Sequence, residues 1–361
     1  MKKLLIAICA AFALVACDDV PKSDKPIMKI GLILPLSGSE AEAGQGALRG
    51  AQMAIAEINA NPDNKFAYKV IAEDAVSDVK NVPPIYNKLK NIDHVDAIYS
   101  IMSAIGLVVK DLATNDKILH ITSSSNESIA DNKFNWLQGH DSDQMFGVLA
   151  KHLKSRGVKT IAVAAKNDAS TAHLVPLYTK NFNDNGLKIV SETFFANGER
   201  DFATDVQKIK QLNPDIVYLH SEDPEQTIFT KALRQGGYTG PITGAFMFVF
   251  AHDLTPFDGV EFVDRNGNPT DEFTKKFTDE FKIKPNSLSG SAYDSVMITY
   301  RAVEKYGRPS DWDAGDVRGY IERATDGYFG ANGRVSLNDA GIMYTKPVMK
   351  VIRAGTVSEI K

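Results

Sequence analysis

The stretch "GLILPLSGSEAEAGQGALRGAQ" places Gly44, Gly46 and Gly50 where an apolar run gives way to a helical pattern. Glycine-spaced loops between a strand and a helix bind the pyrophosphate of dinucleotides, because small residues let the backbone approach the phosphates. Here the glycine spacing is one residue longer than that fingerprint, and Leu36 to Ala43 intervene before the first glycine. Glu40 and Glu42 lie in this insert, and their charge would repel a pyrophosphate. We therefore interpret the glycines as positions of close helix packing.

Other chemistries lack the residues that they need. The sequence contains no G-x-S-x-G for a nucleophilic serine, no H-E-x-x-H and no C-x-x-C for a metal, and its seven histidines are scattered singly. The segment His140-Asp141-Ser142-Asp143 groups potential ligands, but we interpret it as a solvated connection before a helix, with Asp143 as the cap. We expect a protein that is not an enzyme and that has no metal and no cofactor.

The amino terminus has the pattern of an export signal. Lys2 and Lys3 precede an apolar run at residues 4–16, which is too short to span a bilayer and is typical of a signal peptide. The run ends in "LVAC", which resembles the lipobox of bacterial lipoproteins. This resemblance implies cleavage after residue 16 and acylation of Cys17, so residues 1–16 are the signal peptide. Because Cys9 leaves with that peptide, the mature domain has no cysteine pair to form a disulfide.

Residues 17–27 are expected to form a lipidated tether, since they are polar and contain two prolines. Asp18 directly after the cysteine resembles the signal that retains lipoproteins at the inner membrane of Gram-negative bacteria. The expected location is therefore the periplasmic face of that membrane, with contact through the lipid anchor only. Without Lys2 and Lys3 the chain carries 39 basic and 45 acidic residues, a net charge of −6. It has no basic block, so we expect no nucleic-acid partner.

From residue 28 onward, β-branched apolar runs alternate with amphipathic helical stretches. We expect strands at residues 28–34, 68–74, 95–101, 118–122, 160–165, 188–195, 215–220 and 241–246, and helices at 47–60, 105–114, 144–157, 201–212 and 225–237. Continuous apolar runs suit strands that are covered on both faces. The alternation predicts an α/β fold with two doubly wound parallel-sheet lobes. Pro83 and Pro84 must lie in the first turn of their helix.

Several segments together resemble one family. The segments "IGLILPLSG", "GALRGAQMAIAEINA", "ILHITSSSN", "GHDSDQ", "GERDFATDVQKIK", "NPDIVYLHSEDPE" and "SGSAYDSVMITYRAVEKYG" are similar, in this order, to the branched-chain amino-acid-binding (Leu/Ile/Val-binding) family. These are type I periplasmic substrate-binding proteins of ABC transporters. The resemblance covers nearly all of residues 28–310. It implies two lobes joined by a three-segment hinge, with lobe one at residues 28–140 plus 266–334 and lobe two at residues 141–265 plus 335–361.

The resemblance also implies a function. A lipid-anchored, extracytoplasmic protein of this kind captures a small organic solute in the cleft between its lobes and delivers it to the permease of an ABC importer. We expect an amino-acid-like solute, an amide or an amine, and a monomer that closes around it. A second function stays open on the same fold: a lipid-anchored sensor or regulator, such as a cell-wall synthase activator.

In lobe one the resemblance places the binding groups in two loops. In amino-acid-binding relatives, hydroxyls and backbone groups after the third and fourth strands hold the carboxylate of the ligand. Here these loops read "MSAIG" and "TSSSN", which places Ser103 or Ala104, and Ser124, Ser125 and Asn126, at the ligand. The serines could instead cap the following helices, and the two roles are compatible.

In lobe two the sequence departs from the family pattern. Ser170 and Glu222 stand where the family often has aromatic residues, and Phe246 stands where it has the acidic residue that pairs with the ligand's ammonium group. The tyrosine of the first cleft loop is replaced by Ala43. These departures put a standard α-amino acid in doubt as the ligand.

Two of these positions allow two interpretations each. Glu222 either supplies a relocated carboxylate for a cationic group, because a buried ammonium must be paired, or is a solvated charge beside a helix start. Phe246 and Phe248 occupy alternate positions at an expected strand end. They either line the cleft or pack into the core.

Overall fold

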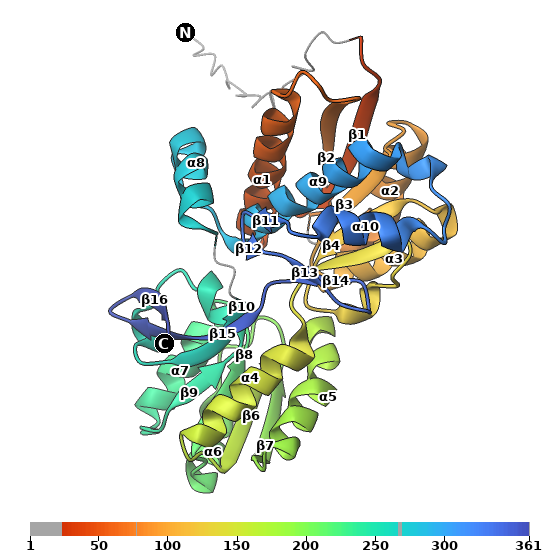
Figure 1. Ribbon diagram of the computed structural model, residues 1–361. Coiled ribbons are helices and arrows are strands. Elements are labelled where there is room, and N and C mark those ends of the chain that lie inside the picture. Colours follow the sequence, from red (N-terminus) through yellow and green to blue (C-terminus); the bar gives the residue numbers. More distant parts are fainter. Residues whose placement is uncertain (1–23, 77, 266–268, 361) are drawn as a thin grey trace, which may run out of the picture.

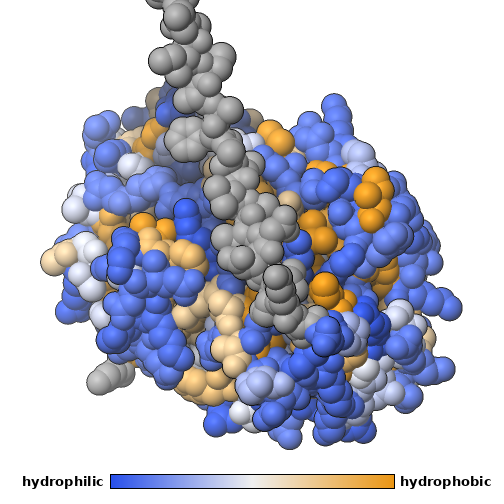
Figure 2. All heavy atoms as spheres, turned by 90° about the horizontal axis from the view of Figure 1, so that it is seen from above, coloured by the Kyte–Doolittle hydropathy of each residue, from blue (hydrophilic) through white to orange (hydrophobic). Residues whose placement is uncertain are grey.

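The computed structural model describes residues 24–76, 78–265 and 269–360, which form two α/β lobes, one above the other in Figure 1. The expected signal peptide at residues 1–16, the acylated Cys17 and most of the tether at residues 17–27 lie outside the described residues. No helix in the described part of the chain is long and apolar enough to cross a membrane. The face of lobe one seen in Figure 2 is mostly hydrophilic, with small separated apolar patches.

Lobe one contains a seven-stranded sheet in the order β13-β14-β5-β4-β3-β1-β2, parallel except for β13. Helices α1, α8, α9 and α10 cover one face of this sheet, and α2 and α3 cover the other. Its elements are β1 (Ile27–Leu34), α1 (Ala41–Asn59), β2 (Ala67–Asp74), η1 (Val79–Asn81), α2 (Val82–Asn91), β3 (Ala97–Ile101), α3 (Ser103–Asp116), β4 (Leu119–Ser123), η2 (Glu127–Ile129), β5 (Asn135–Gly139), α8 (Asp271–Phe281), α9 (Ser287–Tyr306), η5 (Pro309–Asp311), α10 (Val317–Thr325), β11 (Phe329–Gly330), β12 (Gly333–Arg334), β13 (Ser336–Leu337) and β14 (Ile342–Tyr344).

Lobe two repeats this plan with the order β16-β15-β10-β9-β8-β6-β7. Its strands pair in parallel except that β15 is antiparallel to both of its neighbours, β10 and β16. Helices α4 and α5 cover one face, and α6 and α7 cover the other. Its elements are α4 (Ser142–Ser155), β6 (Thr160–Lys166), α5 (Ala169–Asp184), β7 (Lys188–Phe195), α6 (Ala203–Leu212), β8 (Ile216–His220), α7 (Glu225–Gln235), β9 (Ile242–Gly244), η3 (Phe246–Phe250), η4 (Thr255–Phe257), β10 (Glu261–Arg265), β15 (Pro347–Arg353) and β16 (Thr356–Glu359).

The chain passes between the lobes after β5, after β10 and after β14. The expected boundary at residue 335 is wrong, because residues 335–344 remain in lobe one. There β14 pairs in parallel with β5, and its Ile342 and Met343 are buried. Strands of two and three residues have too few positions to produce a recognisable hydrophobic pattern, so the sequence did not reveal β13 and β14.

The eight expected strands are all present, with ends shifted by at most a few residues. The expected position of the two prolines is confirmed, since Pro83 and Pro84 lie in the first turn of α2. The expected cap Asp143 is wrong: the carboxylate of Asp141 accepts a hydrogen bond from the Gln144 backbone N–H and caps α4. The strand end expected at Phe246 is wrong as well, because β9 stops at Gly244 and η3 follows.

The glycines of the opening stretch lie inside α1, which begins earlier than expected, and they allow it to contact its neighbours closely. A Cβ on Gly44 would lie 2.0 Å from the carbonyl oxygen of Pro35, and one on Gly50 would lie 1.9 Å from that of Ser289 in α9. At Gly46 the nearest atom would be the Asn286 amide nitrogen at 2.5 Å. The close helix packing expected at these glycines is confirmed, and the structure identifies α9 as the partner at Gly50.

Replacing Gly50 by alanine is expected to destabilise the protein by roughly 1–3 kcal/mol, because the new methyl group must push α1 away from the α9 backbone. Urea unfolding measures the effect. Gly319→Ala in α10 is the matched control, since its Cβ would meet only the flexible guanidinium of Arg323, at 3.2 Å. We expect this control to be as stable as the parent or up to about 1 kcal/mol more stable. Equal stability of the two variants would contradict the account.

Candidate functional site

The central strands of both sheets end at the junction between the lobes. The first five strands of each lobe along the chain run in the order β2-β1-β3-β4-β5 in lobe one and β7-β6-β8-β9-β10 in lobe two. In such sheets the strand order reverses once, between β1 and β3 and between β6 and β8, and ligands bind outside the carboxyl ends of these strands. The segments that follow these strands carry half of the expected binding residues, namely Ser103, Ala104 and Ser170, at the starts of α3 and α5, and Glu222 after β8.

Three of the expected serines come together and connect the lobes. The hydroxyl oxygen of Ser103, at the start of α3, lies 3.4 Å from that of Ser125, after β4. The Ser125 oxygen lies 2.5 Å from the hydroxyl oxygen of Ser170 in α5 of lobe two. Ser103 is buried, and the other two are half-buried. These three hydroxyls form a row from lobe one to lobe two. Because a hydroxyl both donates and accepts, the row can replace its hydrogen bond between the lobes with a hydrogen bond to a polar ligand.

The other expected residues of lobe one have local roles as well. The Ser124 hydroxyl accepts from the Asn126 backbone N–H at 3.1 Å, and the side-chain oxygen of Asn126 caps η2 by accepting from Ser128. Because its oxygen is used in this cap, Asn126 can offer a ligand only its amide N–H groups. Ala104 is exposed on the first turn of α3 and offers only its backbone. The cap of η2 is therefore Asn126, and the expected capping by the serines is not seen at α3 or η2.

Glu222 pairs within its own lobe. Its carboxylate binds the ammonium group of Lys166 at the end of β6, and Asp168 lies 3.4 Å from the same ammonium. Burial alone would lower the pKa of Lys166, but the carboxylates of Glu222 and Asp168 raise it above its usual value, so the side chain is charged. Neither a lone relocated carboxylate nor a simple solvated charge describes Glu222: it is half of an ion pair.

Glu40 of lobe one faces this ion pair from the loop after β1. Burial raises the pKa of Glu40 above its usual value, Glu222 raises it further, Lys166 lowers it, and Glu225 adds another increase. Glu225 is buried and its carboxylate accepts from the Gly198 backbone N–H at 2.6 Å. Carboxylates of both lobes therefore lie near the ammonium group of Lys166, and the interactions of Glu40 with Glu222 and Lys166 depend on how closely the lobes meet.

Lys166 and Glu40 were not among the expected binding residues. A usable signal existed for Lys166, because it directly follows the buried run "TIAVAA", and the residue after such a strand lies at the carboxyl end of the sheet. Glu40 was noted only for its repulsion of a pyrophosphate. Its position opposite Lys166 depends on the placement of the second lobe.

Phe246 lies at the first passage between the lobes. Its ring stacks on the ring of His140 with centroids 3.9 Å apart. It also forms a T-shaped pair with the ring of His220, with centroids 6.0 Å apart. Burial lowers the pKa of His220, so this imidazole is neutral. Phe246 and Phe248 are both buried. Phe246 belongs to an aromatic stack beside the hinge, whereas Phe248 packs in the core beneath η3 with Phe257 and Phe262.

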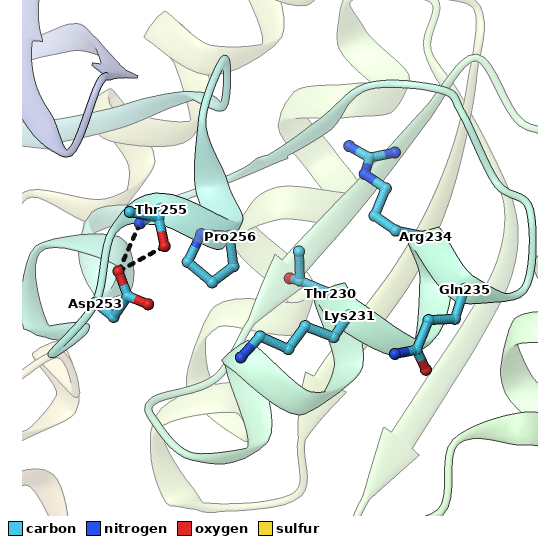
Figure 3. A pocket seen from close by; sticks show the side chains of 7 residues that line it. All are labelled: Thr230, Lys231, Arg234, Gln235, Asp253, Thr255 and Pro256. Atoms are coloured by element: carbon cyan, nitrogen blue, oxygen red, sulfur yellow. Dashed lines mark hydrogen bonds between the residues drawn. The ribbon is translucent and has the colours of Figure 1, made fainter.

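A hollow with a volume of about 320 Å³ lies on lobe two, between α7 and the segment around η4 (Figure 3). Two of its charged groups, Asp253 and Arg234, already have local partners. The carboxylate of Asp253 accepts from the backbone and the hydroxyl of Thr255, and the guanidinium of Arg234 donates to the carbonyl oxygens of Tyr238 and Gly240. None of the expected binding residues lines this hollow. Within residues 24–76, 78–265 and 269–360, no three potential ligands lie close enough together to hold a metal ion.

Comparison with known proteins identifies similar chains. Residues 27–341 match the family model described as periplasmic binding protein. The leucine-, isoleucine-, valine-, threonine-, and alanine-binding protein of Pseudomonas aeruginosa is 25% identical over 295 residues, 78% of this chain and 79% of that protein. The solved leucine binding protein LivK of Thermotoga maritima has a TM-score of 0.80 at 21% identity, covering 92% of this chain and 98% of that one. An ABC-transporter solute binding protein from R. palustris, in complex with benzoate, has a TM-score of 0.78 at 18% identity, covering 92% and 95%.

Glu40→Gln is expected to stabilise the protein at neutral pH. The pKa of the Glu40 carboxyl is higher in the folded state than its ordinary value of 4.5. At a pH above both values, the charged carboxylate therefore destabilises the folded state, and at a pH below both values the carboxyl is protonated in both states and has no such effect. The advantage of the variant should therefore shrink as the pH falls toward 4.5. Urea unfolding between these conditions measures it. Glu42→Gln removes the same charge from an exposed side chain and should show no such trend. A constant difference between Glu40→Gln and the parent at every pH would refute this assignment.

Proposed function

Because the chain belongs to the family of periplasmic binding proteins, we propose that it captures a small organic solute between its two lobes and delivers it to an ABC importer. The observation that carries this proposal is the meeting of the two switch points, with the strand ends of both lobes directed at one junction. A solute held there contacts both lobes and so favours their closed arrangement.

The lobe-one groups that suit the polar part of a solute are the hydroxyls of Ser103 and Ser125, the amide of Asn126, and the backbone at Ala104. Ser124 contributes through the loop that it orders. These groups lie at the start of α3 and around η2, where backbone N–H groups also favour an oxygen-bearing or anionic group. Their chemistry supports a solute with a carboxylate, carboxamide or hydroxyl group.

The lobe-two groups favour a solute that is not a plain branched-chain amino acid. Ser170 offers a hydroxyl where the family often has an aromatic ring, and Phe246 is held in its stack on His140. Glu222 and Lys166, facing Glu40, supply charges of both signs. We propose an amino-acid-like solute, an amide or an amine. One similar protein is a leucine binding protein and another was solved in complex with benzoate, so the shared fold does not fix the solute.

A panel of metabolites tests the solute-binding role. The chain from Asp18 onward is unfolded and refolded to remove any carried ligand, and its melting temperature is followed with amino acids, amides, amines, sugars and nucleosides. A solute at about 100 times its Kd adds roughly 2.7 kcal/mol, which raises the melting temperature by several degrees. A refolded, cooperative protein that responds to no compound would contradict solute binding and favour the regulator.

Variants then locate the site with the compound that binds. Ser125→Ala and Ser170→Ala should each weaken binding roughly two- to tenfold, through loss of one hydrogen bond. Ser358→Ala, on the exposed surface of β16, is the matched control and should bind like the parent. Unchanged affinity after alanine replacement of both Ser124 and Asn126 would remove those two residues from the site.

We also propose that Cys17 carries lipid and tethers the protein to the periplasmic face of the inner membrane. The described body begins at Asp24, three residues before β1, so the anchor and the lobes are joined by a short segment only. The intact mass of the purified protein should equal residues 17–361 plus acyl chains. Cys17→Ser should abolish the added mass, whereas Cys9→Ser should retain it because residue 9 leaves with the signal peptide. Unmodified Cys17 in the parent protein would contradict the anchor.

A further inference from the structure

Met102, the residue between β3 and α3, has a backbone conformation that is almost confined to glycine. Its φ is 72° and its ψ is 142°. For a residue with a side chain, positive φ combined with extended ψ places Cβ against the neighbouring backbone, and such conformations persist only where the surrounding structure enforces them. They occur preferentially at ligand clamps and active sites. Met102 lies at the carboxyl end of β3, beside the switch point of lobe one.

Contacts on both sides of Met102 enforce this conformation. Its backbone N–H donates to the carbonyl oxygen of Ser123 at 2.9 Å, which ties it to the end of β4. Its own carbonyl oxygen accepts from the Gly106 backbone N–H, also at 2.9 Å, as the first bond of α3. Its side chain packs against the core of lobe one. The residue therefore cannot relax without breaking a contact to β4 or to α3.

The conformation determines what the start of α3 presents to the junction. Met102 is the N-cap residue, and its side chain makes no capping hydrogen bond, so it does not cover the first backbone N–H groups of α3. Ser103 follows directly and is buried, with its hydroxyl directed toward Ser125 and so toward the row that ends at Ser170. A residue in an ordinary conformation at position 102 would turn Ser103 and the helix start in another direction.

We infer that Met102 is a positioning residue for the solute site: its enforced backbone conformation holds Ser103 and the uncovered N-terminus of α3 toward the interlobe junction. Met102 acts through these groups and does not itself bind the solute. This inference rests on the proposed function, since it assigns the groups that meet the solute in lobe one.

The test uses two replacements at position 102 and two at the opposite end of the same helix. Met102→Ala keeps a Cβ and therefore the strain, whereas Met102→Gly relieves the strain and lets the loop relax. Lys117, the C-cap residue of α3, is exposed and also has positive φ, at 57°. Lys117→Ala and Lys117→Gly are thus a matched pair at a strained position that does not face the junction.

The inference predicts opposite orders of stability and affinity at position 102. Met102→Gly should melt at a higher temperature than Met102→Ala, the reverse of the usual order for these two residues. It should nevertheless bind the panel solute about tenfold more weakly than Met102→Ala, because the freed loop must be ordered again on binding. Met102→Leu should retain the affinity of the parent. The Lys117 pair should show the same order of melting temperature and equal affinities.

Equal affinities of Met102→Gly and Met102→Ala for a solute that binds the parent would overturn the inference and leave solute binding intact. If the parent binds no compound of the panel, the proposed function fails, and amide hydrogen exchange decides the inference separately. The Gly106 amide should then exchange faster in Met102→Gly than in Met102→Ala, since it is bonded to the residue that relaxes. Equal exchange in the two variants would overturn it.

Discussion

The strand order of the two sheets is the constraint on which the remaining structure depends. In each sheet the second strand lies on one side of the first strand and the later strands lie on the other side. The loops after the first strand and its later neighbour therefore lead to helices on opposite faces of the sheet and leave a crevice between them. Three passages between the lobes keep these loops of the two sheets opposite each other. Consequently the segments after these strands lie at the junction, where hydroxyls, carboxylates and an ammonium group of different lobes approach one another.

The packing of lobe one supports this arrangement from a distance. Gly44, Gly46 and Gly50 let α1 lie against α9 and the loop after β1, which sets the position of Glu40 at the start of α1. In lobe two, Lys166 retains its charge because Glu222 and Asp168 offset the cost of its burial. The junction therefore combines a row of hydroxyls with an ion pair between a lysine and two carboxylates.

Much of the fold could be predicted from the sequence because parallel strands covered on both faces produce continuous apolar runs. The eight expected strands were obtained in this way. The positions of Pro83 and Pro84 followed from the tolerance of proline in a first helical turn, and the family followed from the resemblance of several ordered segments. The strands β5, β10, β15 and β16 were not expected, and neither were β13 and β14, in which too few residues carry a pattern. The cap of α4 was assigned to Asp143 instead of Asp141 because several polar residues adjoin one another there.

The site could be predicted only in part. Loops after strands located Ser103, Ser125 and Ser170, but their mutual contact depends on how two distant parts of the chain meet. The partner of Glu222 is 56 residues away in the sequence, and no local pattern connects it to Lys166. Backbone conformation is the least visible property, since a methionine in a conformation typical of glycine gives no signal in the sequence.

The central claim is that a solute binds between the two lobes and holds them together. The most direct test is a distance measurement between spin labels on the two lobes, at Ser39→Cys and Asn197→Cys, both exposed, in the chain from Asp18 onward, which contains no other cysteine. Without solute, the account predicts a broad distribution that includes distances longer than in the structure. Addition of the bound solute should leave one short distance. A distribution that a bound solute does not change would contradict the claim.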